Sequence, residues 1–514
     1  CKYLISLLRF QSQFLNTAVT TVSFDPGCLR RTEMASCHTT EKDSTSKLLT
    51  DKRLTKSTAS NEKEESYEDQ RIECEKQGKW SELPSLPLEK IYSYVRRQDQ
   101  LNMSLVCRKW SEGFYSPSVW RTFRFELTKS QLLEDTCKLM KFVQKHSNLF
   151  RHVEIERTLV KKKKLKKNWR RRFAEFLQIL TNSTQLISIK FENCGFLFWE
   201  SETTTYNDVY KEIADFLGSQ YHLQRVEFNV CNFYFKESAE ILSKLIEGSR
   251  RSLKHLVLRG FTYYNSMDQE QISNVMQYLS SHLPTLADFP SLIILEIDYS
   301  LIFESIIAPL SNSIQTIKKS QTRGLSKIIL NFHHGWMGIE EFRGLTSTDW
   351  QFLQKLCPDL KVEFNFIRSS LSWREVTFFI LPNMPILSLK FMNNRTDLEV
   401  AELFNHLLAC NTNGHLVTLH LDWGKRIQHL SSIFAPFLHA CKKLKSLELF
   451  IKSTTNDINL LLNSWLENPH ATLEKVIIYA SGDIHASDPS LLNLISENVS
   501  RLKLMGLNIW LHLS

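Results

Sequence analysis

The sequence predicts an α/β chain in which a short all-helical segment precedes a long solenoid of strand–helix repeats. Three observations predict this fold class. Apolar residues recur in the pattern L-x-x-L-x-L between residues 186 and 509, and their alternation has the period of a β-strand. The stretches between these copies change to a helical period, as at 173–180 and 458–465. An apolar-dense segment without this repeat, Leu83–Trp120, comes before them.

Residues 1–79 are predicted to be a disordered N-terminal segment. Residues 35–79 are rich in Ser, Thr, Lys and Glu, with Tyr67 as the single aromatic residue. Such a composition buries too little apolar surface to offset the entropy of ordering the chain. The apolar stretch Tyr3–Leu8 is too short for a signal-peptide core. Because the chain starts with Cys, we expect the true start to be Met34.

The segment from Leu83 to Trp120 has more apolar side chains than it can bury by itself. Large apolar residues and Cys occupy 17 of its 38 positions. A segment of about 40 residues hides too small a fraction of its surface to be secure alone. The sequence therefore predicts a surplus of apolar surface that faces another protein.

This segment, taken as residues 80–125, resembles an F-box along its whole length. Leu83-Pro84 opens it, and Ile91–Val95 stands at the position of the family's I-F-S-Y-L helix. Leu105–Arg108 with Trp110 matches the V-C-[KR]-x-W stretch. Further matches are the acidic residue after the first helix and the closing [LV]-W pair, at Asp99 and Val119-Trp120.

The F-box resemblance implies a partner and a function. In that family the short helices dock on a Skp-type adaptor, which joins them to a cullin–RING ligase. The chain would then be the substrate-recognition subunit of an SCF-type E3 ubiquitin ligase. The implied adaptor contacts are Leu83, Pro84, Leu88, Ile91, Tyr92, Val95, Leu105, Val106, Cys107, Trp110 and Trp120. Tyr92 stands where Phe is commoner, so its hydroxyl needs water or an acceptor if it is buried. The alternative is an ordinary helical hairpin with two core tryptophans.

Residues 126–514 look like a leucine-rich-repeat solenoid, with parallel strands on the concave face and helices outside. Ten intervals between residues 186 and 504 give a repeat of about 32 residues, longer than the usual 20–29. Weaker copies begin at Trp120, Phe150 and Val362. The alternative is a doubly wound α/β domain, which would need a ligand crevice at a topological switch point. No loop in the sequence suits such a crevice.

The residues between the apolar positions of each copy are predicted to face the concave side, where a macromolecule binds. Phe450, Tyr479 and Trp510 occupy the same offset in three successive copies. Neighbouring strands lie about 4.8 Å apart, so these rings would form one exposed strip. The predicted substrate-binding residues are His420, Asp422, Glu448, Phe450, Tyr479 and Trp510. Packing of the rings against each other or against a C-terminal cap is the alternative.

The segment 161–172, KKKKLKKNWRRR, is predicted to be a basic insertion between repeats. The net charge of the whole chain is +9, so this segment accounts for the excess. Its basic residues are Lys161, Lys162, Lys163, Lys164, Lys166, Lys167, Arg170, Arg171 and Arg172. It would serve as a nuclear-import signal, as a docking loop for an acidic partner, as a phosphate contact to nucleic acid, or only as a solvated insertion. Nucleic acid is the least favoured because only Trp169 offers a stacking ring.

The composition argues against catalysis and against cofactor or metal binding. Gly is scarce, with 15 residues, and the chain has neither GxGxxG nor GxxxxGK[ST]. Its eleven cysteines include no C-x-x-C pair, and no run of 18 apolar residues could span a membrane. We therefore expect a non-enzymatic protein of the cytoplasm and/or nucleus, with reduced thiols and no cofactor. Two other functions stay open: an F-box scaffold without ligase activity, and a repeat protein that binds nucleic acid through 161–172.

Overall fold

The computed structural model describes most of the residues that follow residue 79. The residues it describes are 80–95, 97–134, 137–157, 162–183, 185–195, 203–263, 268–307, 324–333, 339–367, 372–394, 398–482 and 489–513. They all fall within one compact unit, Lys79–Ser514. The predicted disordered segment 1–79, with Met34, lies outside the described residues.

Four short helices follow a single 3-10 turn at the start of this unit. They are η1 (Trp80–Glu82), α3 (Ser85–Tyr94), α4 (Arg97–Ser104), α5 (Arg108–Phe114) and α6 (Pro117–Trp120). Pro117 stands at the first position of α6, where its fixed φ suits a helix and its missing N–H costs no hydrogen bond. The predicted all-helical segment is confirmed.

Thirteen parallel strands form one sheet in the described part of the chain, and their order follows the sequence from β1 to β13. A doubly wound sheet would reverse its strand order at a switch point, so this alternative is excluded. The strands are β1 (Thr122–Phe125), β2 (His152–Glu156), β3 (Ser188–Glu192), β4 (Arg225–Asn229), β5 (His255–Arg259), β6 (Ile294–Asp298), β7 (Lys327–His333), β8 (Lys361–Ile367), β9 (Ile386–Asn394), β10 (Thr418–Arg426), β11 (Ser446–Lys452), β12 (Lys475–Ser481) and β13 (Asn508–Leu513).

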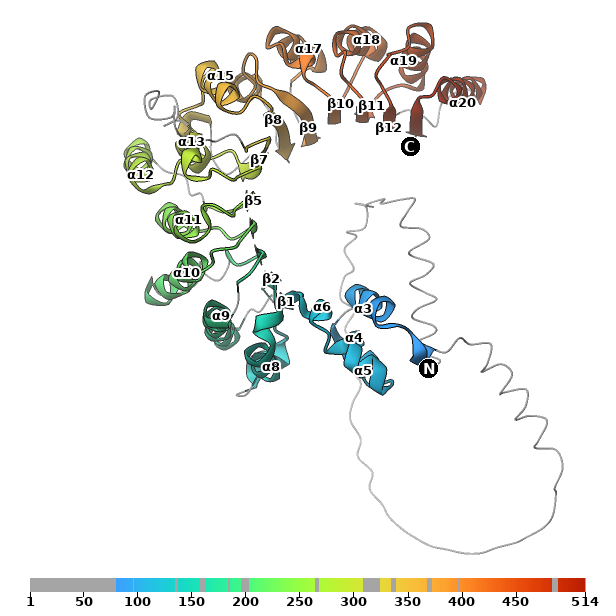
Figure 1. The fold of residues 1–514 in the computed structure, drawn as a ribbon. Coiled ribbons are helices and arrows are strands. Elements are labelled where there is room, and N and C mark those ends of the chain that lie inside the picture. The colour runs from blue at the N-terminus through green and yellow to red at the C-terminus, as the bar shows by residue number, and fades with distance from the viewer. Residues whose placement is uncertain are drawn as a thin grey trace, which may run out of the picture. The chain divides into compact units, whose positions relative to one another are not determined.

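Helices follow most strands and lie on the outer side of the solenoid, while the strands line its inner, concave side (Figure 1). This arrangement is the predicted irregular leucine-rich-repeat fold. The helices are α7 (Lys129–Leu133), α8 (Lys138–His146), α9 (Lys163–Ser183), α10 (Thr203–Gly218), α11 (Phe235–Ser249), α12 (Gln269–His282), α13 (Leu301–Ile307), α15 (Ser347–Leu356), α16 (Trp373–Phe379), α17 (Val400–Ala409), α18 (Leu430–Ala440), α19 (Thr455–Glu467) and α20 (Pro489–Leu504). Short 3-10 turns lie at η2 (Ser147–Leu149), η4 (Leu286–Asp288), η6 (Ile339–Glu341) and η7 (Thr412–Gly414).

The core is built from the apolar positions of the repeated pattern. Every second residue of a strand points between the sheet and the helices, and in β3 these residues are Ile189 and Phe191, both buried. The Phe191 ring stacks on Phe228 of β4, with centroids 5.0 Å apart and planes within 6°. Equivalent positions of successive repeats thus stack on one another. The predicted strand pattern is confirmed from β1 to β12.

Several helices begin at capping residues that can be read in the sequence. In α12 the Asp268 carboxylate accepts a hydrogen bond from the backbone N–H of Gln271, whose side chain accepts in turn from the Asp268 N–H. The same reciprocal pair of capping hydrogen bonds is present at the start of α7, α15 and α16. Losing such a cap costs about 1 kcal/mol, so these residues fix where each helix starts.

The last repeat is shifted from its predicted position. The L-x-x-L-x-L pattern assigns Leu504, Leu507 and Ile509 to the last copy, but α20 continues to Leu504, which is 88% exposed. Gly506, at φ 92°, turns the chain out of the helix in the left-handed region that glycine tolerates. The strand therefore starts two residues later, and Ile509 pairs with Val476 while Leu511 pairs with Ile478.

The basic segment is also placed differently from the prediction. Residues 163–172 form the first half of α9, a 21-residue helix of the solenoid, and are not an insertion between repeats. The apolar positions Leu165 and Trp169 of this half are buried, and they continue the buried face of Phe173 and Phe176. A helical face of this kind anchors the whole segment to the core. Lys161 lies outside the described residues.

Candidate functional site

The interior of the helical segment is formed by Leu88, Tyr92, Trp110 and Trp120, which are all buried. The Tyr92 hydroxyl donates a hydrogen bond to the carbonyl oxygen of Trp110 at 2.7 Å, so it has the acceptor that the sequence required. Burial raises the pKa of Tyr92 to about 12, and the hydroxyl therefore keeps its proton at neutral pH. These four side chains were predicted to contact the adaptor, but they face the segment's own core. An amphipathic helix turns its periodic apolar face inward.

Close helix packing and hydrogen-bonded tryptophan indoles stabilise this interior. The Trp110 indole N–H donates to the carbonyl oxygen of Trp80 at 2.9 Å, and that of Trp120 donates to Phe114 at 2.6 Å. A Cβ atom on Gly113 would lie 2.7 Å from Leu88 Cδ2. A larger residue at position 113 would therefore have to displace the Leu88 side chain.

The outer surface of the same segment carries large apolar side chains that have no cover. Leu105 is 84% exposed and Leu86 is 76% exposed, and Val106 and Leu101 are exposed as well. Leu105 and Val106 were predicted contacts, whereas Leu86, Leu101 and Tyr94 were not. Of the other predicted contacts, Pro84 is exposed, and those partly exposed are Leu83, Ile91, Val95 and Cys107. We call Leu86, Leu101, Leu105 and Val106 the apolar surface.

The helical segment joins the first repeat directly. Trp120 closes α6, and its ring lies 4.2 Å from that of Phe142 in α8. One residue later, the carbonyl oxygen of Arg121 accepts hydrogen bonds from the N–H groups of Arg151 and His152, where β2 begins. The helical segment and the solenoid therefore share side-chain and backbone contacts and are not joined by a free linker.

At the other end of the solenoid, aromatic rings form a row across the concave face. Phe450 of β11 stacks on Tyr479 of β12, with centroids 4.5 Å apart and planes within 12°. His420 lies 5.1 Å from the Phe450 ring, and His512 lies 5.6 Å from the Tyr479 ring. Tyr479 remains 42% exposed. We call His420, Phe450, Tyr479 and His512 the ring row.

A charged group lies beside the ring row. Glu448 accepts hydrogen bonds from His420 Nδ1 at 3.0 Å and from Lys475 Nζ at 3.1 Å. The hydrogen bond from His420, with that from Lys475, lowers the pKa of Glu448 to about 2. The carboxylate is therefore ionised throughout the physiological range. Asp422 pairs in register with Phe450.

Trp510 does not belong to the ring row as predicted. It pairs in register with Ile477, and His512 takes the position beside Tyr479 because the last strand is shifted by two residues. Trp510 is 61% exposed, with Lys503 Nζ 5.9 Å from its ring centroid. His512 was missed because the sequence pattern placed the strand too early. Substrate binding by these residues stays a prediction.

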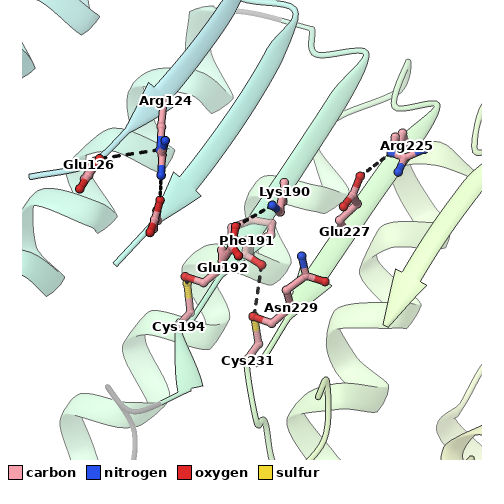
Figure 2. Close-up of polar contacts among 11 residues, drawn as sticks. Arg124, Glu126, Lys190, Phe191, Glu192, Cys194, Arg225, Glu227, Asn229 and Cys231 are labelled. Atoms are coloured by element: carbon pink, nitrogen blue, oxygen red, sulfur yellow. Dashed lines mark hydrogen bonds and ion pairs between the residues drawn. The ribbon is translucent and has the colours of Figure 1, made fainter. Parts of the chain in front are cut away.

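Strands β1 to β5 present a different concave face, lined by ion pairs, and Figure 2 shows the pairs of β1 to β4. Lys190 Nζ lies 2.6 Å from Glu192, and Arg225 pairs with Glu227 in the next strand. Arg259 pairs with Glu296, and Arg124 pairs with Glu126 and Glu156. The mixed charges that the sequence placed here thus neutralise one another. The buried thiols of Cys194 and Cys231 lie below them, at the ends of β3 and β4.

The basic residues of α9 and the preceding Lys162 differ in exposure, and Arg170 is half-buried. Lys166 and Arg172 are buried, and Arg172 pairs with Glu175 at 3.0 Å. The exposed ones are Lys162, Lys163, Lys164, Lys167 and Arg171. Trp169, the one ring expected to stack on bases, is fully buried against Phe173 with centroids 4.8 Å apart. The nuclear-import and acidic-partner interpretations stay predictions.

No group of three or more His, Cys, Asp or Glu side chains in the described ranges is arranged to hold a metal ion. No helix in those ranges combines the length and apolar character that crossing a bilayer requires.

Comparison with known proteins agrees with the helical segment. The F-box-like family matches residues 80–126. F-box/LRR-repeat protein 21 of Bos taurus is 41% identical over 51 residues, which are 10% of this chain and 12% of that protein. The Mus musculus protein of the same name gives the same values, and the Ovis aries protein is 39% identical over 51 residues. The similarity thus spans about 12% of the length of these relatives. Together with the repeated strand–helix units, these matches show a chain that carries an F-box-like domain followed by repeats of the leucine-rich type.

Proposed function

We propose that this chain is the substrate-recognition subunit of an SCF-type E3 ubiquitin ligase. The observation that carries the proposal is the uncovered apolar surface on a domain that matches the F-box-like family. The F-box would bind a Skp-type adaptor, and through it a cullin–RING ligase, while the repeats bind a protein substrate. The relatives it resembles are named for the same two modules.

The energy of adaptor binding would come from the apolar surface. Burying one Leu side chain is worth about 1.5–3 kcal/mol relative to leaving it in water. Leu86, Leu101 and Leu105 therefore offer several kcal/mol to a partner that covers them. Several large apolar side chains exposed on one small domain are typical of an interaction site. The buried residues Tyr92 and Trp110 would act indirectly, because they hold α3 and α5 in place.

Substrate binding is assigned to the ring row, with Trp510, Glu448 and Asp422 beside it. Aromatic side chains dominate binding hot spots, where a truncation costs at least about 2 kcal/mol. Tyr479 and Trp510 are the rings with most surface left to bury. The row stands in a parallel strand surface, as the binding faces of repeat proteins do.

The proposed mechanism is proximity. The chain supplies no catalytic residue and holds a client near the ubiquitin-charged conjugating enzyme. Tethering converts transfer to a client lysine into an effectively intramolecular step, which raises the local lysine concentration. A protein with this role works in the cytoplasm and/or nucleus, where cullin–RING ligases act.

The proposal is tested by affinity purification of the full chain from cells with and without inhibition of cullin ligases. We expect adaptor and cullin to co-purify, and client proteins to accumulate on the chain when the ligase is inhibited. Clients should also live longer when the chain is depleted. Co-purification of adaptor with no change in the lifetime of any client would instead indicate a scaffold without ligase activity. No adaptor at all would refute the proposal.

A further inference from the structure

The outer side of the first repeats is strongly basic. Helices α7, α8 and α9, with the residue before α9, expose nine cationic side chains to solvent. We call these residues the cationic surface: Lys129, Lys138, Lys141, Lys145, Lys162, Lys163, Lys164, Lys167 and Arg171. The three helices pack together, since α9 contacts both α7 and α8.

The centre of the cationic surface is one row on α9. Lys164, Lys167 and Arg171 are three and four residues apart, so they lie on one face of the helix. At about 1.5 Å of rise per residue, the row spans about 10 Å. The opposite face carries Leu165 and Trp169, which are buried in the core. The row is therefore presented outward by a helix whose other side is anchored.

The stability of the fold does not explain this row. Lys164 lies in the first turn of α9, where a cation opposes the helix dipole by about 0.3–1 kcal/mol. The nearby carboxylate of Glu175 is already paired with Arg172, at 3.0 Å. Within the described residues, no ion pair joins Lys164, Lys167 or Arg171 to a carboxylate. Three like charges held together without counter-charges are better explained by a partner that supplies them.

The chemistry of the cationic surface favours a short acidic protein segment over nucleic acid or a membrane. Lysine ammonium groups are flexible point charges that adapt to irregular carboxylates. With Trp169 buried, the α9 row has no ring on which a base could stack. The next helices along the outer side expose Asp215 and Glu247, and Glu247 is paired with Lys244. A rigid duplex or a flat bilayer lying along this side would bring its phosphates to those carboxylates, whereas a short flexible segment can stay on the α9 row.

We propose that the cationic surface docks a short, flexible segment rich in Glu and Asp from a partner protein. This contact is separate from adaptor binding and from the ring row. Surface charge pairs of this kind mainly speed association and select the partner, and they weaken steeply as salt screens them. The contact is therefore fast, reversible and sensitive to ionic strength.

The test uses the full chain purified with its adaptor, or alone if no adaptor binds. A fluorescent peptide of about twelve residues, alternating Glu with Gly or Ser, is titrated and followed by anisotropy at about 50 and about 300 mM salt. We expect binding that weakens with salt and falls at least about tenfold in K164Q/K167Q/R171Q. The matched control K355Q/K442Q/K443Q removes three exposed lysines elsewhere and should change affinity less than about twofold.

Two further arms make the outcome decisive. The variant K164R/K167R/R171K keeps the charge and should keep peptide binding. This result would show that the glutamine variant loses affinity through its lost charge and not through altered side-chain packing. If the melting temperature of the glutamine variant is well below that of wild type, K138Q/K141Q/K145Q on α8 provides the same comparison. Equal peptide affinity in the folded glutamine variant and wild type would overturn the proposal. So would tighter, α9-dependent binding to a duplex of about 20 base pairs or to phosphatidylserine vesicles.

Discussion

The two ends of the concave face differ, although the same backbone repeat builds both. Strands β1 to β5 carry cross-strand and same-strand ion pairs, such as Arg124 with Glu156 and Lys190 with Glu192. Strands β10 to β13 carry the ring row, in which Phe450 stacks on Tyr479. The backbone of the strands is thus the same at both ends, and only the side chains on the concave face distinguish one end from the other.

This difference indicates where binding energy is available. A partner that docks on β1 to β5 must strip water from charges that already neutralise one another, and it gains little net free energy. A partner that covers Tyr479 and Trp510 removes apolar surface from water without breaking any ion pair. The C-terminal end should therefore supply most of the affinity for a client, and the N-terminal end should contribute mainly selectivity.

The largest expected effect is on client capture. The double variant Y479A/W510A should remove roughly 4 kcal/mol of binding, because each truncated ring costs about 2 kcal/mol. Client proteins that accumulate on wild type under ligase inhibition should then be lost, as measured by quantitative mass spectrometry of the purified complexes. Both rings are well exposed, so the melting temperature should barely change.

The matched control for this prediction is R225A/E227A, which removes one ion pair from β4. It should leave client capture close to wild type. Equal losses in the two double variants would mean that the whole concave face binds as one surface. A melting temperature many degrees lower in Y479A/W510A would show that the rings hold the fold together.

A smaller effect concerns the acid stability of the C-terminal end. The hydrogen bonds from His420 and Lys475 lower the pKa of Glu448 from its ordinary value, near 4.5, to about 2. A carboxyl with a depressed native pKa stabilises the fold above the unfolded pKa, and this contribution is lost as pH falls toward the native pKa. The stability difference between wild type and E448Q should therefore shrink between about pH 5 and about pH 2. Chemical denaturation at several pH values would measure it, and a constant difference would contradict the assignment.

The smallest effect is expected from the ion pairs of β1 to β5. Lys190 and Glu192 are partly exposed, and such pairs contribute about 0.2–1 kcal/mol. A double-mutant cycle of K190A and E192A, followed by urea unfolding, should give a coupling energy in that range. A coupling energy above about 2 kcal/mol would mean that these pairs are structural anchors, and the contrast between the two ends would then need revision.

Much of the fold could be predicted from the sequence, because its strongest signals are local. Alternating Leu, Ile, Val and Phe predict strands, and residues such as Asp268 and Thr346 mark helix starts by their capping chemistry. The last strand was misplaced because Leu504 and Leu507 satisfy the pattern by chance. The deciding residue is Gly506, which ends α20 through its backbone freedom and has no apolar signature.

The surfaces were harder to predict than the fold. Periodicity identifies the apolar residues of α3 and α5, but it does not say which of them meet each other and which remain uncovered. Trp110 therefore proved to be core, and Leu86 proved to be surface. The basic segment was interpreted as an insertion between repeats because its lysines hide the apolar spacing of Leu165, Trp169 and Phe173. This spacing makes the segment half of a helix.

The central claim is that the apolar surface binds a Skp-type adaptor, and a direct affinity measurement tests it. Purified wild type, L105D and L504D are titrated with the adaptor by calorimetry. Leu105 and Leu504 are about equally exposed, so neither substitution should unfold the chain, and only Leu105 belongs to the apolar surface. We predict that L105D weakens adaptor binding by at least about tenfold, or about 1.4 kcal/mol, while L504D binds like wild type. Equal affinity in all three proteins, or no adaptor binding by wild type at micromolar concentration, would contradict the claim.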